Sequence, residues 1–183
     1  RGIQGSFFPP ADGILYREML DVHSIHFLLE ATTDYLSLVK ELDIAYLDLG
    51  GKAESLETLR SAWLIPSRYD TADVPYVKHM LQHALPLDAR SQIVTELFRK
   101  HVGRTQADFA DELYISESET KKMIEHGMYV GSHGARHLWL GRESKASQVL
   151  EIESGLDFLS KVGANTKEWI MCYPYGSYNQ DTL

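Results

Sequence analysis

The alternation of helix-like and strand-like segments near the C-terminus limits the fold more than any other feature of this sequence. A capping-box pattern at 116–119 predicts the start of a helix. An apolar strand is predicted at 128–131, a helix at 146–162 and a second strand at 169–173. This order is typical of an α/β sheet or barrel, in which functional groups gather beyond the carboxyl ends of the strands.

The remainder of the chain has a different pattern. A strand is predicted at 3–8, and the two prolines that follow it end any strand ladder. Residues 20–112 are mostly helical in pattern and contain few strand signals. Within them, 73–75 has the form of a helix start, and a helix at 88–100 precedes Gly103 as a stop.

Composition excludes several classes of protein. The 183 residues are 44% hydrophobic, which suits one globular domain. A net charge of −8 argues against a nucleic-acid partner, and no apolar run approaches the roughly 18 residues of a membrane span. The single cysteine, Cys172, allows no internal disulfide, which is compatible with a reducing compartment. The location stays open, and we favour the cytoplasm for the chain as given. Because Cys172 follows an apolar strand, we expect its side chain to be buried.

Two histidines follow the strand predicted at 128–131. His133 and His137 are four residues apart, which places two imidazoles on one face if the segment is helical. Gly131 and Gly134 allow the backbone to approach a ligand closely. The pair is therefore a candidate metal site that still needs a third ligand, and the alternative is two unrelated surface histidines.

The spacing alone does not identify a metal site, because the chain contains a second pair with the same spacing. His79 and His83 lie in a predicted amphipathic helix without a strand end beside them. We expect that pair to be structural or exposed. The same is expected of the remaining histidines, which are His23, His26, His101 and His126.

The segment GSHGARHLWL at 131–140 resembles the second motif of the NodB-type polysaccharide deacetylases, carbohydrate esterase family four. That motif is His-(Ser/Thr)-x-x-His, and both of its histidines bind a divalent metal, so the resemblance assigns His133 and His137 as ligands. Gly134 stands where the family has a hydroxyl residue. YPYGSYN resembles the third motif, Arg-x-Pro-Tyr-Gly, with Cys172 at the arginine position. GSFFPP is similar to the family's second strand.

The resemblance implies an α/β fold that is part of a distorted (β/α)7 TIM-like barrel, the NodB homology fold. Residues 1–183 would form a partial deacetylase domain, with 20–112 a mainly helical insertion that could shape the substrate site or form an oligomer interface. The family's first motif, Thr-Phe-Asp-Asp, supplies the catalytic base and the third metal ligand. We expect that motif upstream of Arg1 and the catalytic acid beyond Leu183.

The activity implied is metal-dependent hydrolysis of N-acetyl groups on a carbohydrate, with zinc as the expected metal and cobalt or nickel as alternatives. The backbone N–H of Tyr175 would contact the oxyanion. Tyr173 and Trp139 would bind substrate by stacking on sugar rings, unless they are core or rim aromatics. The chain alone is predicted to be inactive. Cys172 and the absent aspartates leave open a non-catalytic carbohydrate-binding or protein-interaction domain on a degenerate deacetylase fold.

Overall fold

The computed structural model describes residues 2–183 and the side chains of all of them except His83 and Asp88. The chain forms two compact units. One unit consists of the residues up to Leu20 together with Ala107–Leu183, and the other is Asp21–Gln106. No helix within residues 2–183 combines the length and the apolar character needed to cross a membrane.

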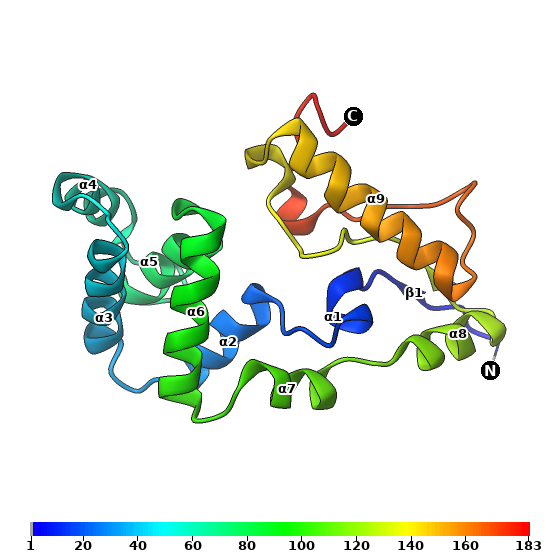
Figure 1. Ribbon diagram of the computed structural model, residues 1–183, viewed down its shortest axis with the longest axis horizontal. Coiled ribbons are helices and arrows are strands. Elements are labelled where there is room, and N and C mark those ends of the chain that lie inside the picture. Colours follow the sequence, from blue (N-terminus) through cyan, green and yellow to red (C-terminus); the bar gives the residue numbers. More distant parts are fainter. Residues whose placement is uncertain (1) are drawn as a thin grey trace. The chain divides into compact units, whose positions relative to one another are not determined.

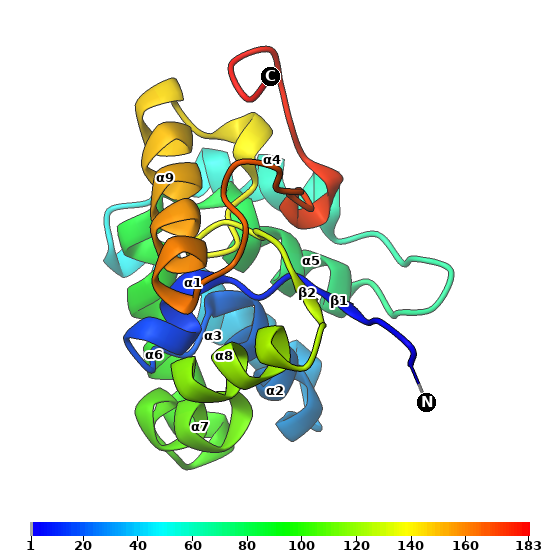
Figure 2. The same ribbon diagram turned by 90° about the vertical axis from the view of Figure 1, so that its right-hand side faces the viewer.

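A small parallel sheet lies in the first unit. Strands β1 (Ser6–Phe7) and β2 (Tyr129–Val130) pair in parallel and run side by side in Figure 2. Both occur within the strands predicted at 3–8 and 128–131, although they are shorter. The strand predicted at 169–173 is wrong as a strand, because only one parallel bridge, between Ser132 and Met171, connects it to the sheet. The described residues are thus mostly helical with a small sheet, consistent with part of an α/β deacetylase fold.

Four helices accompany the sheet (Figure 1): α1 (Ala11–Leu15), α7 (Gln106–Leu113), α8 (Glu117–Glu125) and α9 (Lys145–Val162). The predicted capping box of α8 is confirmed, since the Ser116 N–H donates to Glu119 at 2.7 Å and the Glu119 N–H donates to Ser116 Oγ at 3.2 Å. Glu117 joins α8 to α9 through Lys161, whose Nζ lies 2.7 Å from its carboxylate.

The apolar core of this unit lies between α1, β2 and the C-terminal half of α9. Its buried members come from all three elements and from the loop after β2. They are Ala11, Ile14, Val130, Ala135, Phe158, Leu159 and Val162. The core therefore supports the segment that carries the two histidines from one side.

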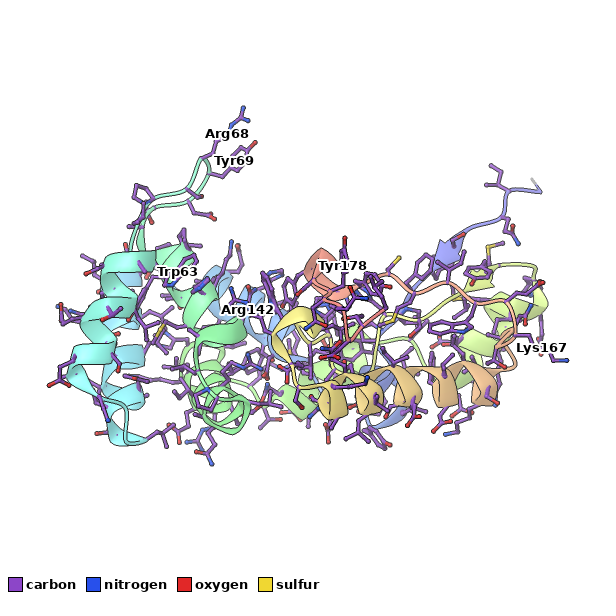
Figure 3. The ribbon with its side chains drawn as sticks, turned by 90° about the horizontal axis from the view of Figure 1, so that it is seen from above. Trp63, Arg68, Tyr69, Arg142, Lys167 and Tyr178 are labelled. Atoms are coloured by element: carbon purple, nitrogen blue, oxygen red, sulfur yellow. The ribbon has the colours of Figure 1, made fainter. Side chains whose placement is uncertain are left out.

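The second unit is helical and has its own core. Its helices are α2 (Asp21–Ala31), α3 (Tyr35–Asp48), α4 (Ala53–Trp63), α5 (Asp73–His79), a π-helical turn (Met80–Ala84) and α6 (Leu87–Val102). The helix start at Asp73 and the stop at Gly103, which has φ 75°, are confirmed. Arg68 and Tyr69 project from the loop between α4 and α5 in Figure 3. The core includes Ile25, Leu28, Leu38, Leu42, Tyr76, Val77, Ile93 and Val94.

A buried carboxylate, that of Asp43, links three helices of this unit. Asp43 on α3 accepts a 2.6 Å hydrogen bond from the Tyr76 hydroxyl and a 2.8 Å hydrogen bond from Nε of Arg60. Burial, and then the bond to Asp43, raise the pKa of the Tyr76 phenol. Removing either partner of this carboxylate would be costly, because it would leave a buried polar group without a hydrogen bond.

Candidate active site

The two candidate ligands lie in the histidine loop, residues 131–140, which follows β2. Their rings meet edge to face with centroids 4.6 Å apart. The segment is not a helix, so the two rings do not share a helix face as their four-residue spacing would have predicted. Left-handed backbone at Gly134 (φ 73°) and His137 (φ 63°) turns the loop instead, and the rings still come together.

A backbone carbonyl fixes the tautomer of His133. Its Nδ1 lies 2.7 Å from the carbonyl oxygen of Cys172. Because a carbonyl only accepts hydrogen bonds, Nδ1 carries the proton and Nε2 keeps the lone pair that a metal needs. Histidine ligands usually have such an outer hydrogen bond, which sets the ring orientation. The arrangement at His133 therefore fits a metal ligand.

The side chain of Cys172 is exposed, so the expectation that it would be buried is wrong. Ile170, two residues earlier, is also exposed. Side chains two residues apart share a face of an extended segment, and this face of the short sheet is open in the part of the chain described. The contact described between Cys172 and the site is the one that its carbonyl oxygen makes with Nδ1 of His133.

A tight turn supplies the second half of the site. Pro174–Gly176 forms a 3-10 turn, in which the Gly176 N–H donates to the Tyr173 carbonyl at 2.9 Å. Tyr175 has φ 57°, and its ring lies edge-on to His137 with centroids 4.7 Å apart. Left-handed backbone at a non-glycine residue costs about 1–2 kcal/mol, and such residues are concentrated at functional sites. Because His137 and Tyr175 both have such backbone and their rings are in contact, this position is a candidate functional site.

The predicted sugar-binding aromatics lie around the same turn. Trp139 stacks on Tyr175 at 4.5 Å and 20°, and the Arg142 guanidinium carbon is 5.4 Å from the centre of the Trp139 ring. Tyr173 lies against Tyr178 with centroids 5.5 Å apart. Arg142 and Tyr178 are labelled in Figure 3. Since Trp139 and Tyr175 cover each other, each ring has at most one face left for a sugar.

Helix α9 supports both segments through polar side chains that sequence reasoning missed. On this helix the apolar Val149 is 42% exposed, whereas the polar Gln148 and Glu151 are each 1% exposed. Glu151 accepts hydrogen bonds from the histidine loop. Gln148 accepts a 2.6 Å bond from the Thr182 hydroxyl and donates to Asn179 at 3.2 Å. Burial of two polar residues one turn apart follows from these bonds, which apolar periodicity cannot reveal.

Helix α1 holds the loop from another direction. The N–H groups of Ala11 and Asp12 donate to the carbonyls of Gly134 and Ala135 at 3.1 Å and 3.0 Å. Burial, and then the negative charge of Glu151, raise the pKa of the Asp12 carboxyl, which therefore keeps its proton to a higher pH than an ordinary aspartate.

The two histidines would supply two ligands to a metal ion. Within residues 2–183, leaving aside the undescribed side chains, no group of three or more histidine, cysteine, aspartate or glutamate residues is arranged to hold a metal ion. A catalytic zinc site uses three protein ligands and an open position. His133 and His137 therefore match part of such a site.

Three histidines outside the loop contact other side chains or lie exposed at the surface. Nε2 of His101 lies 2.9 Å from Glu41, and His79 stacks on Trp63. His126 is exposed after α8. The side chain of His83, which we expected to be structural or exposed, lies outside the described residues. The structure thus separates His133 and His137 from other histidines of similar spacing by their context.

Comparison with known proteins agrees with the motifs. A family model described as polysaccharide deacetylase matches residues 86–183, which is more than half of the chain and includes the histidine loop and the Pro174–Gly176 turn. No curated protein and no solved structure was found to match. The resemblance inferred from the sequence is confirmed, and the chain belongs to the family of NodB-type polysaccharide deacetylases.

Proposed function

We propose that this chain carries the metal-binding part of a hydrolase that removes N-acetyl groups from a carbohydrate. Membership of the family supports a hydrolase of this class. The observation that carries the proposal is the edge-to-face pair of His133 and His137, with Nδ1 of His133 bound to a carbonyl. That arrangement leaves Nε2 of His133 available to a metal.

A divalent ion, with zinc the first choice, fits the donor set because imidazole nitrogen suits zinc, and it also suits cobalt and nickel. His133 and His137 would hold it. When bound, such an ion polarises the acetyl carbonyl and lowers the pKa of water towards about 7. In the overall reaction the water oxygen bonds to the carbonyl carbon, the C–N bond breaks, and the amine leaves with an added proton.

The remaining site residues are proposed to bind and orient the substrate. The backbone N–H of Tyr175 would donate to the acetyl oxygen as negative charge develops on it. Support comes from the strained turn that holds Tyr175 in ring contact with His137. Trp139 and Tyr173 would contact sugar rings through the ring surface that Tyr175 and Arg142 leave open on Trp139 and that Tyr178 leaves open on Tyr173.

We further propose that the two strands and the bridged segment at Met171 are neighbouring strands of a distorted (β/α)7 barrel. Their parallel order supports this assignment. Residues 20–112 would be an insertion between barrel elements and a possible oligomer interface. Because a third ligand is absent among the described residues, we expect the 183 residues alone to release no acetate from acetylated chitooligosaccharide.

One observation supports a second candidate, a non-catalytic carbohydrate-binding or protein-interaction domain. The family's third motif begins with arginine, and here Cys172 occupies that position with an exposed thiol side chain. A thiol cannot supply the charge or the hydrogen-bonding geometry of a guanidinium group. A domain that has lost catalysis would tolerate this change.

Zinc binding by single-histidine variants tests the proposal. His133→Ala should weaken binding, because it removes the ligand whose Nε2 is available, and His79→Ala should not. The His79 variant is a matched control, since that side chain stacks on Trp63. Affinities are measured by competition with a chromophoric chelator, and circular dichroism verifies folding. Equal losses in the two variants would show that the wrong histidines were chosen.

A further inference from the structure

We propose that Glu151 is a positioning residue that fixes the histidine loop in the conformation that binds metal. The inference rests on the proposed function, because it concerns how His133 and His137 are held. Glu151 lies on α9, is 1% exposed and touches neither reacting groups nor the imidazole rings in any contact described for it.

The carboxylate binds the backbone between the two ligands. Oε1 of Glu151 accepts hydrogen bonds from the N–H of Ala135 at 3.0 Å and from that of Arg136 at 2.7 Å. The N–H of Leu138 points to the same oxygen at 3.5 Å. One oxygen therefore gathers N–H groups on both sides of His137, and the loop is curved around it.

A charge at this depth requires compensation, which the loop supplies. Oε1 of Glu151 is held by the N–H groups, whereas Oε2 accepts no hydrogen bond from the described residues and is compensated by the charge of Arg136, whose Nε lies 3.5 Å away. Buried carboxylates are tolerated when they are paired and hydrogen-bonded, and bonds to a charged acceptor are the stronger ones. The loop and the carboxylate thus depend on each other.

Glycines allow this contact. A Cβ added at Gly134 would lie 2.8 Å from Oε1 of Glu151, so the backbone passes directly over the carboxylate. One turn further along α9, a Cβ at Gly155 would lie 2.6 Å from Oγ of Ser132. That hydroxyl accepts the N–H of Gly134 at 3.2 Å. Helix α9 is therefore a close-fitting support for the start of the histidine loop.

The consequence for metal binding follows from the strain at His137. Its left-handed backbone, φ 63°, lies between Arg136 and Leu138, whose N–H groups both point to Glu151. Without the carboxylate the loop can relax to unstrained backbone, which separates the two imidazoles. Partners that orient a metal ligand change metal affinity by about 10–100-fold when removed, and we expect a loss of that size.

The test compares zinc affinity in four variants of the 183-residue chain. Glu151→Ala removes the acceptor, and Glu151→Asp keeps the charge on a shorter side chain, so both should weaken zinc binding by about 10–100-fold. Glu151→Gln retains one acceptor oxygen at the same position and should recover part of the affinity. Glu153→Ala, on the exposed face of the same helix, is the matched control and should bind as the wild type does.

A second measurement separates this inference from the proposed function. Amide hydrogen exchange at Arg136 without zinc should accelerate in Glu151→Ala and Glu151→Asp and stay unchanged in Glu153→Ala. If the wild type binds no zinc through His133, the proposed function fails, and the exchange rates still test the anchor. Should the alanine variant not fold, the aspartate and glutamine variants decide the result. Wild-type zinc affinity and exchange in folded Glu151→Asp would overturn the inference.

Discussion

Replacing Gly134 with alanine tests how closely the histidine loop lies on α9. Gly134 has φ 73°, and an added Cβ would lie 2.8 Å from Oε1 of Glu151. Gly127 is a matched control, because it has φ 80° and nothing within 4 Å of an added Cβ. Both substitutions place a side chain on left-handed backbone, and only the first also forces a contact.

The magnitudes follow from these two differences. Left-handed backbone costs a residue with a Cβ about 1–2 kcal/mol, so Gly127→Ala should lower the free energy of unfolding by that amount. Gly134→Ala adds the cost of displacing a buried carboxylate that holds the loop, about 1–3 kcal/mol by analogy with overpacked cores. The total expected for Gly134→Ala is about 2–5 kcal/mol. The hydroxyl residue that the family usually has here should be no better tolerated than alanine.

Urea unfolding of the unit that contains the loop provides the assay. In a Trp63→Phe background the remaining tryptophans, Trp139 and Trp169, both lie in that unit and report its unfolding by fluorescence. The free energies are compared by linear extrapolation. Equal losses for Gly134→Ala and Gly127→Ala would refute the close contact between the loop and Glu151.

Three further predictions concern supports away from the ligands. Ser116→Ala should lower the free energy of unfolding by about 1 kcal/mol, because it removes the capping box of α8, and the same fluorescence assay measures it. Gln148→Ala should cost about 0.5–1.5 kcal/mol in that assay, because it removes the acceptor that the Thr182 hydroxyl has on α9, while Asn179 Oδ1 remains as a second acceptor at 3.2 Å. Burial raises the pKa of Glu41, but its bonds to His101 and Lys100 outweigh burial and hold it below the usual 4.5. Stability from this group is complete above pH 4.5 and is lost as the pH falls through the lower folded value, which urea unfolding detected by Trp63 would show as a falling midpoint.

The helices were predictable because their end signals are local. The capping box at Ser116, the start at Asp73 and the stop at Gly103 each depend on a few adjacent residues, and the structure has all three. The third strand was not predictable in the same way. An apolar segment at Met171 has strand character, but ladder formation depends on partners elsewhere in the chain, and only a single bridge forms with Ser132.

The part of the site that belongs to a sequence motif was predictable. The part that depends on contacts between distant residues was not. Proximity of His133 and His137 could be expected from their spacing, although the loop reaches it through left-handed backbone rather than a helix. The burial of Glu151 could not be predicted, because a glutamate on an amphipathic helix is normally expected to face solvent, and Glu151 is 1% exposed. Its burial depends on N–H groups more than ten residues away. The carbonyl of Cys172 left no signal in the sequence at all.

Direct observation of the histidine ring nitrogens during zinc titration tests the central claim, that the histidine loop is a metal site. Long-range 15N–1H NMR spectra resolve Nδ1 and Nε2 of each imidazole in the 183-residue chain. We predict that one equivalent of zinc shifts the His133 and His137 resonances together. Zinc should bind Nε2 of His133, while Nδ1 of His133 keeps its proton in the hydrogen bond to the Cys172 carbonyl. Zinc that shifts His79 instead, or leaves both loop histidines unchanged, would contradict the assignment of a metal-dependent deacetylase site.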